Sequence, residues 1–308
     1  MTARYTNAET GKYAFQAKLN LNISDSFSNG NGQSVFSQGN LQNEHGTVHN
    51  RASNYLNPTL DLYYSKNIGK KDELSLNLVG SHYDTNSTQF DREWILNSNQ
   101  DVFNNDMILK AKQNGIVAEV AHSHSFKKGK LNSGYRISNN SISNDLQNLA
   151  GNSNYTVNYL QQYLYTEYSG KKDKFTYRLG LGLTNIHNKS AETVTNNWSP
   201  TPKIVLGYQI NKNQSIRFSS DYTLRSPSSQ ALSSNIVQVV PNITQFGNPL
   251  LKPYSLFYNS LQYRLNNKYF DMNVVVFHNY LPNSFSQFYI KTDNGFGLTY
   301  VNSELLEI

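Results

Sequence analysis

Two histidines near the middle of the chain are the residue pair best suited to bind a metal ion. His122 and His124 are two positions apart, and side chains at positions i and i+2 of a β-strand point to the same face. Neutral imidazole nitrogens are common metal ligands. Because the sequence places no third ligand beside them, we interpret them as a lumen-facing or strand-end pair, with metal binding as the less favoured alternative.

A second group of polar residues offers oxygen atoms of the kind that calcium binds: Asp101, Asn104, Asn105 and Asp106. The spacing and the glycine of an EF-hand loop are absent, so a polar loop is the favoured interpretation. The chain also lacks a nucleophile elbow, a P-loop, a zinc-hydrolase motif and a dinucleotide fingerprint. Paired carboxylates can meet in space without a sequence signature. We therefore assign no catalytic, cofactor-binding or metal-binding residue and do not expect an enzyme.

The composition favours β-strands. The 308 residues include 22 Tyr and 15 Phe but only 3 Met and no Cys, and aromatic residues are enriched in strands. The lack of cysteine excludes a disulfide scaffold and thiolate metal sites. The mean hydropathy of −0.60 would suit a soluble protein, but it also suits a membrane β-barrel, in which only alternate residues face lipid. No run of about 18 apolar residues predicts a transmembrane helix.

The net charge of +6 does not indicate a nucleic-acid partner. Nucleic-acid binding requires a basic stripe, with aromatic residues interleaved. The lysines instead gather at predicted turns, at Lys70, Lys71, Lys127, Lys128, Lys130, Lys171, Lys172, Lys174, Lys212 and Lys268. We therefore interpret the positive charge as belonging to a set of short basic turns.

The clearest strands lie between residues 203 and 265. Segments 203–210 and 215–224 alternate apolar with small or polar residues and are joined by a tight turn at 211–214. A polar loop of more than twenty residues then precedes a third strand at 254–265. Such a loop is unusual in a compact soluble domain, where connections are about 4 to 6 residues long. A short turn at one strand end and a long loop at the other is typical of transmembrane β-barrels.

The same alternation of short turns and long polar stretches recurs along the chain. Long loops are expected at 25–54, 83–106, 143–158 and 185–202, and a final hairpin is expected over 285–302, turning at Asp293, Asn294 and Gly295. The pattern predicts about 12 to 13 strands of about 10 to 12 residues, long enough to cross a membrane when tilted. Aromatic side chains near strand ends are expected to form interfacial girdles, at Tyr13, Tyr64, Tyr83, Tyr165, Tyr208, Tyr254 and Tyr280.

A motif follows the second of these strands. Arg225 and Pro227 are separated by one residue, and Leu232 lies a few positions on. The sequence Gly247, Asn248, Pro249, Leu250, Leu251, Lys252, Pro253 then leads into a strand. This arrangement resembles the later barrel region of TonB-dependent outer-membrane receptors, and it is most similar to the group called the outer-membrane β-barrel family. We expect the motif residues to shape the loop, since proline fixes φ and Gly-Asn permits a left-handed turn.

The resemblance implies an all-β fold, an antiparallel transmembrane β-barrel in the outer membrane of a Gram-negative bacterium. It implies about 22 strands in the complete barrel, so residues 1–308 are expected to be one barrel-domain fragment without a plug domain. No signal peptide, energy-coupling segment or C-terminal aromatic residue is recognised, and Tyr254 stands where the family often has an acidic residue.

The resemblance also implies a function and partners. The full-length protein is expected to take up an external ligand, a siderophore, glycan or peptide, driven by a TonB-type protein, with outer-membrane lipid around the barrel and no cofactor. A passive porin or a barrel enzyme would share this architecture and would be favoured only if the full-length gene lacked a plug. The alternative from another class is a secreted or surface-exposed structural or adhesive all-β protein without transport activity. Such a protein would share the alternating pattern but enclose a dry core.

Overall fold

The computed structural model describes residues 1–38, 41–240, 242–293 and 295–303 of the chain, and all regular structure among them is β-strand. The strands are β1 (Thr2–Glu9), β2 (Tyr13–Gln38), β3 (Leu41–Asn67), β4 (Asp72–Ile95), β5 (Gln100–Phe126), β6 (Gly129–Asn148), β7 (Gly151–Lys172), β8 (Phe175–Ser190), β9 (Thr193–Pro200), β10 (Lys203–Asn211), β11 (Gln214–Arg225), β12 (Ile236–Val240), β13 (Ile243–Phe246), β14 (Tyr254–Asn266), β15 (Asp271–Tyr280), β16 (Phe285–Thr292) and β17 (Gly295–Asn302). In this described part of the chain, no helix long and apolar enough to cross a membrane is found.

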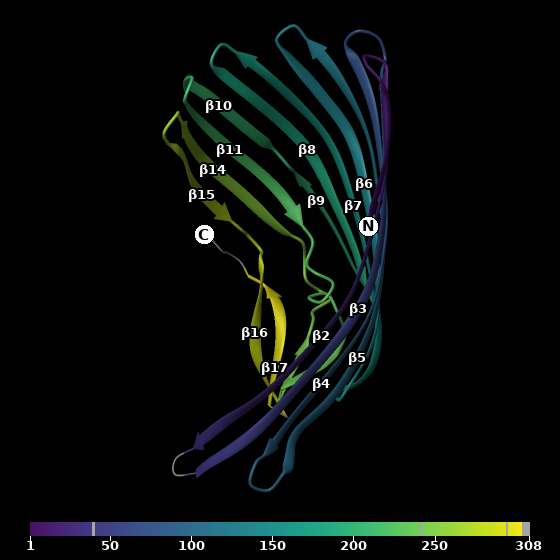
Figure 1. Ribbon diagram of the computed structural model, residues 1–308, viewed down its shortest axis with the longest axis vertical. Helices are drawn as coiled ribbons and strands as arrows, with labels where there is room; N and C mark the ends of the chain where they lie inside the picture. The colour runs from purple at the N-terminus through teal and green to yellow at the C-terminus, as the bar shows by residue number, and fades with distance from the viewer. Residues whose placement is uncertain (39–40, 241, 294, 304–308) are drawn as a thin grey trace.

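A curved, 13-stranded antiparallel sheet forms the wall of the molecule. Its strands follow the chain order from β1 to β15, with β9 paired to β8 and with β12 and β13 left out of the sheet. β1 and β15 are the two edges, so the wall is an open trough rather than a closed barrel (Figure 1). This agrees with the predicted all-β architecture and with a chain that supplies part of a larger barrel.

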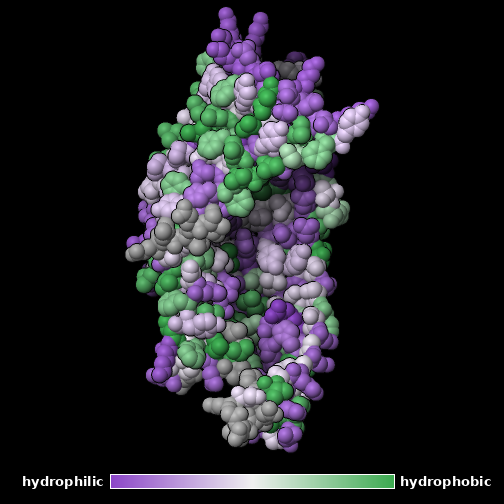
Figure 2. Space-filling model, turned by 90° about the vertical axis from the view of Figure 1, so that its left-hand side faces the viewer, coloured by the Kyte–Doolittle hydropathy of each residue, from purple (hydrophilic) through white to green (hydrophobic). Residues whose placement is uncertain are grey.

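The two faces of the wall differ in chemistry because side chains alternate along each strand. On the convex face, large apolar side chains are exposed across successive strands, including Leu76 (46%), Ile116 (51%), Leu181 (59%) and Val276 (65%). Figure 2 faces the β10–β15 side of the molecule, where hydrophobic surface gathers over the upper half, below a hydrophilic end where the short turns lie. An exposed apolar band of this kind is what a lipid-facing barrel surface requires. We call this convex, apolar region the outer band.

The predicted long loops are wrong for four of the polar stretches, which continue as paired strands. β2 and β3 stay in register from Tyr13 opposite Lys66 to Gln38 opposite Leu41, and β4 through β7 extend in the same way. The strands β2 to β8 therefore run for 16 to 27 residues rather than 10 to 12. The reason is that apolar residues are sparse in these extensions, so backbone pairing continues without the regular hydrophobic alternation that reveals a strand.

A second, four-stranded sheet lies on the concave side of the wall, in the order β12-β13-β17-β16 (Figure 1). The hairpin β16–β17 matches the predicted strand bounds of 285–302, although Asn294 of its turn lies outside the described residues. β13 and β17 pair in parallel, with Thr244 opposite Gly297. This pairing joins the connection between β11 and β14 to the segment that follows β15. We call the four strands the inner sheet.

The contrast between the two faces of β4 gives a direct test of the outer band. Leu76 points to the outer band, whereas its neighbour Asn77 lies on the concave face opposite Glu119. We expect Leu76→Lys to lower the unfolding free energy of the full-length protein in lipid vesicles by about 2 to 4 kcal/mol, because lysine is then placed in hydrocarbon. Asn77→Lys is the matched control and is expected to cost under about 1 kcal/mol. Equal effects, measured by urea unfolding, would contradict the assignment of the two faces.

Candidate functional site

A chamber of about 400 Å³ lies between the inner sheet and the concave face of β5, β6 and β7. The wall contributes Met107, Leu109, Asn144, Leu146 and Tyr155; the inner sheet and the connection before it contribute Ser229, Gln230, Ser233, Asn235, Val237, Gln245, Phe246, Gly247 and Tyr300. Its size is within the range of small-molecule pockets. Residues from several separate stretches of sequence therefore meet around one half-open space.

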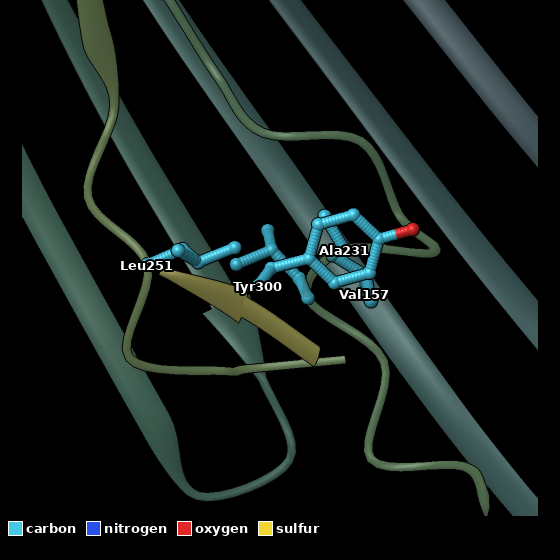
Figure 3. Close-up of a cluster of buried hydrophobic side chains, with 5 residues drawn as sticks. Val157, Ala231, Leu251 and Tyr300 are labelled. Atoms are coloured by element: carbon cyan, nitrogen blue, oxygen red, sulfur yellow. The ribbon is translucent and has the colours of Figure 1, made fainter. Parts of the chain in front are cut away.

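A small apolar cluster fixes the inner sheet to the wall beside this chamber. Val157 of β7 is fully buried against Ala231, Leu232, Leu251 and Tyr300 (Figure 3). Burying side chains of this size stabilises the contact by about 1.5 to 3 kcal/mol each. The cluster is the main apolar core among the described residues, because the outer band faces away from it.

Hydrogen bonds reinforce the same attachment. The Ser190 hydroxyl of β8 donates to the carbonyl oxygen of Leu232 at 2.7 Å. The Asn248 side-chain amide donates to the carbonyl oxygen of Tyr300 at 2.9 Å, so the two connections that build the inner sheet are tied together.

Asn105 is the second attachment point, at the far end of the chamber. Its side chain is 1% exposed. Its amide nitrogen donates to the carbonyl oxygen of Gln238 in β12 at 3.2 Å, and its amide oxygen accepts from the Leu149 backbone at 2.9 Å. The Asn148 side chain also donates to the Ile236 carbonyl oxygen at 3.1 Å. Together these contacts hold β12 against the tips of β5 and β6.

The lining of the chamber is mainly apolar, with neutral polar groups and no charged residue. Asn235 is 6% exposed, and its side-chain oxygen is buried without a hydrogen-bond partner. Beyond the outer band, burial raises the pKa of the Tyr155 hydroxyl, which lies beside Ser233 and Asn144. The hydroxyl therefore stays protonated at neutral pH. The chamber thus offers neutral donors and acceptors on an apolar and aromatic surface.

The residues of the predicted motif lie around this chamber. Leu232 and Leu251 are in the apolar cluster, and Pro227 is also fully buried. Gly247 allows a close approach of backbones, since a Cβ atom there would lie 2.5 to 2.7 Å from the carbonyl oxygens of Ser233, Gln230 and Ala231. Asn248 donates its backbone N–H to the Ala231 carbonyl oxygen at 2.6 Å.

The remaining three motif residues are placed nearby. Pro253 is buried, Pro249 is half-buried, and Arg225 ends β11 as an exposed residue. All eight residues thus belong to one connection, which runs from the wall to the inner sheet and back.

The two predicted metal-site histidines lie elsewhere, at the end of the wall where the short turns are. His122 Nε2 and His124 Nδ1 both contact Asp72 Oδ1, at 3.0 and 2.7 Å. The strand register places all three on the convex face, so they form a strand-end pair but do not face the lumen. The hydrogen bond from His124 holds the pKa of Asp72, which begins β4 beside a turn, below its usual value. Within the described residues no group of three or more potential ligands is placed to hold a metal ion.

The predicted calcium-type oxygens do not converge. Asp101 is paired with Arg92, whose guanidinium nitrogen lies 2.7 Å away. Asn104, Asn105 and Asp106 are consecutive strand residues, so Asn105 points to the concave face and its two neighbours to the convex face. The polar-loop interpretation is also wrong, because all four residues belong to β5.

The concave face behind the outer band is lined by charged and hydroxyl groups. They include Glu119, Arg136, Tyr165, Glu167, Arg178 and Lys203, whose positions follow from the strand register. The Tyr165 hydroxyl donates to Glu119 at 2.6 Å, and Arg178 Nε lies 3.3 Å from a Glu167 oxygen. Polar groups at this level suit a water-filled or protein-filled lumen and not an apolar core.

Some contributors to the chamber carried no signal in the sequence. Asn235 lies in an irregular stretch, and Tyr155 lies in a stretch that is expected to be a polar loop; Tyr300 belongs to the expected hairpin 285–302, but nothing in the sequence places it beside the other two. They meet only because the inner sheet folds back onto β7, a contact between residues far apart in the chain. The Gly247–Pro253 motif and the expected hairpin 285–302 are the nearby signals, and neither predicts the lining of the chamber.

A protein-family model and several solved structures match this chain. A family model described as "Outer membrane protein beta-barrel family" matches residues 66–304. None of the curated proteins compared with this sequence matches it.

Solved structures share the fold at low identity. The ferric-catecholate import receptor Fiu of E. coli K12 matches with a TM-score of 0.62 at 10% identity, over 99% of this chain and 59% of its own. The ferric preacinetobactin receptor BauA of Acinetobacter baumannii matches with a TM-score of 0.55 at 9% identity, over 99% and 57%. The ferric yersiniabactin uptake receptor FyuA of Yersinia pestis matches with a TM-score of 0.53 at 10% identity, over 99% and 54%. The chain therefore spans somewhat more than half the length of these structures.

Gly247 provides a test of the attachment of the inner sheet. In Gly247→Ala the added methyl group would overlap three carbonyl oxygens, at a cost of about 1 to 3 kcal/mol. We expect limited proteolysis of the full-length protein within residues 226–253 to become roughly 5- to 150-fold faster.

The matched control is Gly80→Ala, because nothing lies within 4 Å of a Cβ atom at Gly80. Its cleavage rate should equal that of the unmodified protein. Unchanged proteolysis in Gly247→Ala would show that the close approach at Gly247 does not hold the connection in place.

Proposed function

Because the chain belongs to the outer membrane protein beta-barrel family, we propose that it is part of an outer-membrane receptor mediating energy-coupled uptake of an external ligand. Proteins of this family lie in the outer membrane of Gram-negative bacteria and are not enzymes. The resemblance seen at residues 225–253 is confirmed at the level of the family.

The observation that carries the proposal is the position of the chamber. It lies at the long-strand end of the wall, beyond the outer band, where external loops of a barrel are found. From there the concave face continues past charged groups such as Glu119 and Arg136 towards the short turns. A ligand captured in the chamber would therefore stand above a polar lumen.

The adhesive alternative fits these observations less well. A dry β-sandwich would place apolar side chains on the concave face, whereas that face carries Glu119, Glu167 and Lys203 at the level of the outer band. The apolar residues are exposed on the convex face instead. This arrangement supports a barrel that surrounds polar contents.

We further propose that residues 1–308 are one piece of a barrel domain of about 22 strands. In this proposal the motif residues from Arg225 to Pro253 have a structural role. They shape the connection that contains β12 and β13 of the inner sheet, and they do not themselves bind ligand. Energy coupling by a TonB-type protein would act through other parts of the full-length receptor.

Uptake is tested by comparing the culture media of three strains: unmodified cells, cells lacking the gene, and gene-deleted cells carrying it on a plasmid. Mass spectrometry of the media is expected to show at least one class of compound that is depleted only when the gene is present. An uncoupler of the proton-motive force should abolish the depletion. Depletion that survives the uncoupler would indicate a passive barrel, and identical media in all strains would refute uptake.

A further inference from the structure

The end of the wall where the short turns lie carries positive charge at every turn. Each of the turns that join the strands there contains a lysine: Lys12, Lys70, Lys128, Lys174, Lys212 and Lys268. The hairpin tips described at the opposite end, residues 96–99, 149–150 and 191–192, contain none. We call the lysine-bearing turns the basic rim. Because the rim borders the outer band (Figure 2), its lysines lie at the level of lipid headgroups.

The lysines of two adjacent turns in the middle of the rim are not neutralised by the protein. Lys127 and Lys128 form the turn between β5 and β6, and Lys172 ends β7 just before its turn into β8. The two turns are neighbours because β6 pairs with β7. Within the described ranges these three lysines form no ion pair, and Asp173 is the single carboxylate of the two turns. An unbalanced positive field of this kind attracts anions.

A continuous row of aromatic rings lies on the convex face beside these two turns. The ring centroids of Phe126 and Tyr168 are 6.1 Å apart, those of Tyr168 and Tyr177 are 5.9 Å apart, and those of Tyr177 and Phe175 are 6.2 Å apart. Phe126 and Phe175 are exposed. The register places Tyr168 opposite Leu179, an exposed residue of the outer band, so the row faces lipid. Aromatic rings at this level of a membrane protein lie among the headgroups.

The two tyrosines of the row carry their hydroxyl groups to the level of the turns. A Cβ atom at Gly129 would lie 2.6 Å from the Tyr168 hydroxyl oxygen, and one at Gly170 would lie 2.5 Å from that of Tyr177. Each ring therefore lies over a glycine backbone. The position at Gly170 is also 2.8 Å from the Lys128 carbonyl oxygen, so the Tyr177 hydroxyl is close to the β5–β6 turn. Hydroxyl and ammonium groups are suitable hydrogen-bond donors to phosphate oxygens.

We propose that the convex face at these two turns binds the headgroup of an anionic phospholipid. Lys127, Lys128 and Lys172 attract the phosphate, the hydroxyls of Tyr168 and Tyr177 donate hydrogen bonds to it, and the acyl chains lie against the outer band. A zwitterionic headgroup is held less tightly because its own cation is repelled by the lysines. Each lysine near a membrane surface strengthens binding of anionic lipid about five-fold. The site thereby holds the short-turn end of the barrel to one leaflet.

The test places a fluorescent reporter beside the site in the full-length protein. Leu179→Trp introduces the reporter opposite Tyr168, whereas Trp94 and Trp198 lie towards the other end of the wall. The protein is reconstituted in mixed vesicles of phosphatidylcholine and phosphatidylglycerol, and one of the two lipids carries brominated acyl chains, which quench nearby tryptophan. The signal of the protein without Leu179→Trp is subtracted. We expect phosphatidylglycerol to be preferred beside the reporter by at least about ten-fold.

Two variants, each combined with the reporter, separate the headgroup contacts from folding. In Lys127→Gln/Lys128→Gln/Lys172→Gln the preference should fall to within about two-fold of none, because the attracting charges are gone. Tyr168→Phe keeps the ring and every charge, and it should lower the preference about two- to five-fold through the lost hydrogen bond. In vesicles of phosphatidylcholine alone, both should show the unmodified temperature of the heat-induced gel shift, since exposed substitutions of this kind have small effects on stability.

The matched control is Lys110→Gln/Lys112→Gln/Lys189→Gln. It also removes three lysines from the convex face, but from the strand extensions beyond the outer band. We expect it to leave the preference for phosphatidylglycerol unchanged. An equal loss of preference in the control would show a general effect of net charge and would refute a site at the two turns.

Three further results would overturn the inference: equal quenching by the two brominated lipids, a preference that survives both variants, or a preference abolished by inorganic phosphate but not by sodium chloride of equal ionic strength. The last result would assign the lysines to phosphate in solution and not to lipid. The measurement needs neither an external ligand nor energy coupling, so its outcome is independent of the proposed uptake.

Discussion

The structure depends on the requirement that every backbone N–H and C=O group inside a membrane be hydrogen-bonded within the protein. An antiparallel sheet meets it by pairing each strand with two neighbours, and here the pairing runs without interruption from β1 to β15 across the wall. Once the backbone is satisfied in this way, side chains need only alternate between lipid and lumen. That alternation permits a low mean hydropathy of −0.60 in a chain that faces lipid on one side.

The same pairing explains how a polar site is built beyond the membrane. The strands β2 to β8 extend far past the outer band, and their concave side becomes a platform for the inner sheet. The platform and the inner sheet meet at Val157 and Asn105, one through apolar contact and the other through hydrogen bonds to backbone. The connection between β11 and β14 and the segment after β15 are far apart in the chain. They are joined because β13 and β17 pair with each other through backbone hydrogen bonds.

Much of the wall could be predicted from the sequence, and the reason is physical. Where one face meets lipid, apolar residues recur every second position, and the expected strands at 203–210, 215–224 and 254–265 match β10, β11 and β14 within one residue at each end. The strand extensions could not be predicted, since apolar residues are too sparse in them to show a regular alternation. The expected aromatic girdles hold only in part: the register puts Tyr64 and Tyr208 on the convex face but Tyr83, Tyr165 and Tyr254 on the concave one. The chamber was not predictable, because its lining meets only in three dimensions.

The central claim is that the chamber and the long strand ends face the outside of the cell while the short basic turns face the periplasm. The chain contains no cysteine, so a single cysteine can report the location of each end. We would introduce Glu192→Cys, in the turn between β8 and β9, or Lys128→Cys, in the turn between β5 and β6, and treat intact cells with a membrane-impermeant maleimide. The account predicts that the cysteine at 192 is labelled on intact cells and that the cysteine at 128 is labelled only after the outer membrane is permeabilised. The reverse pattern, or labelling of both on intact cells, would contradict it.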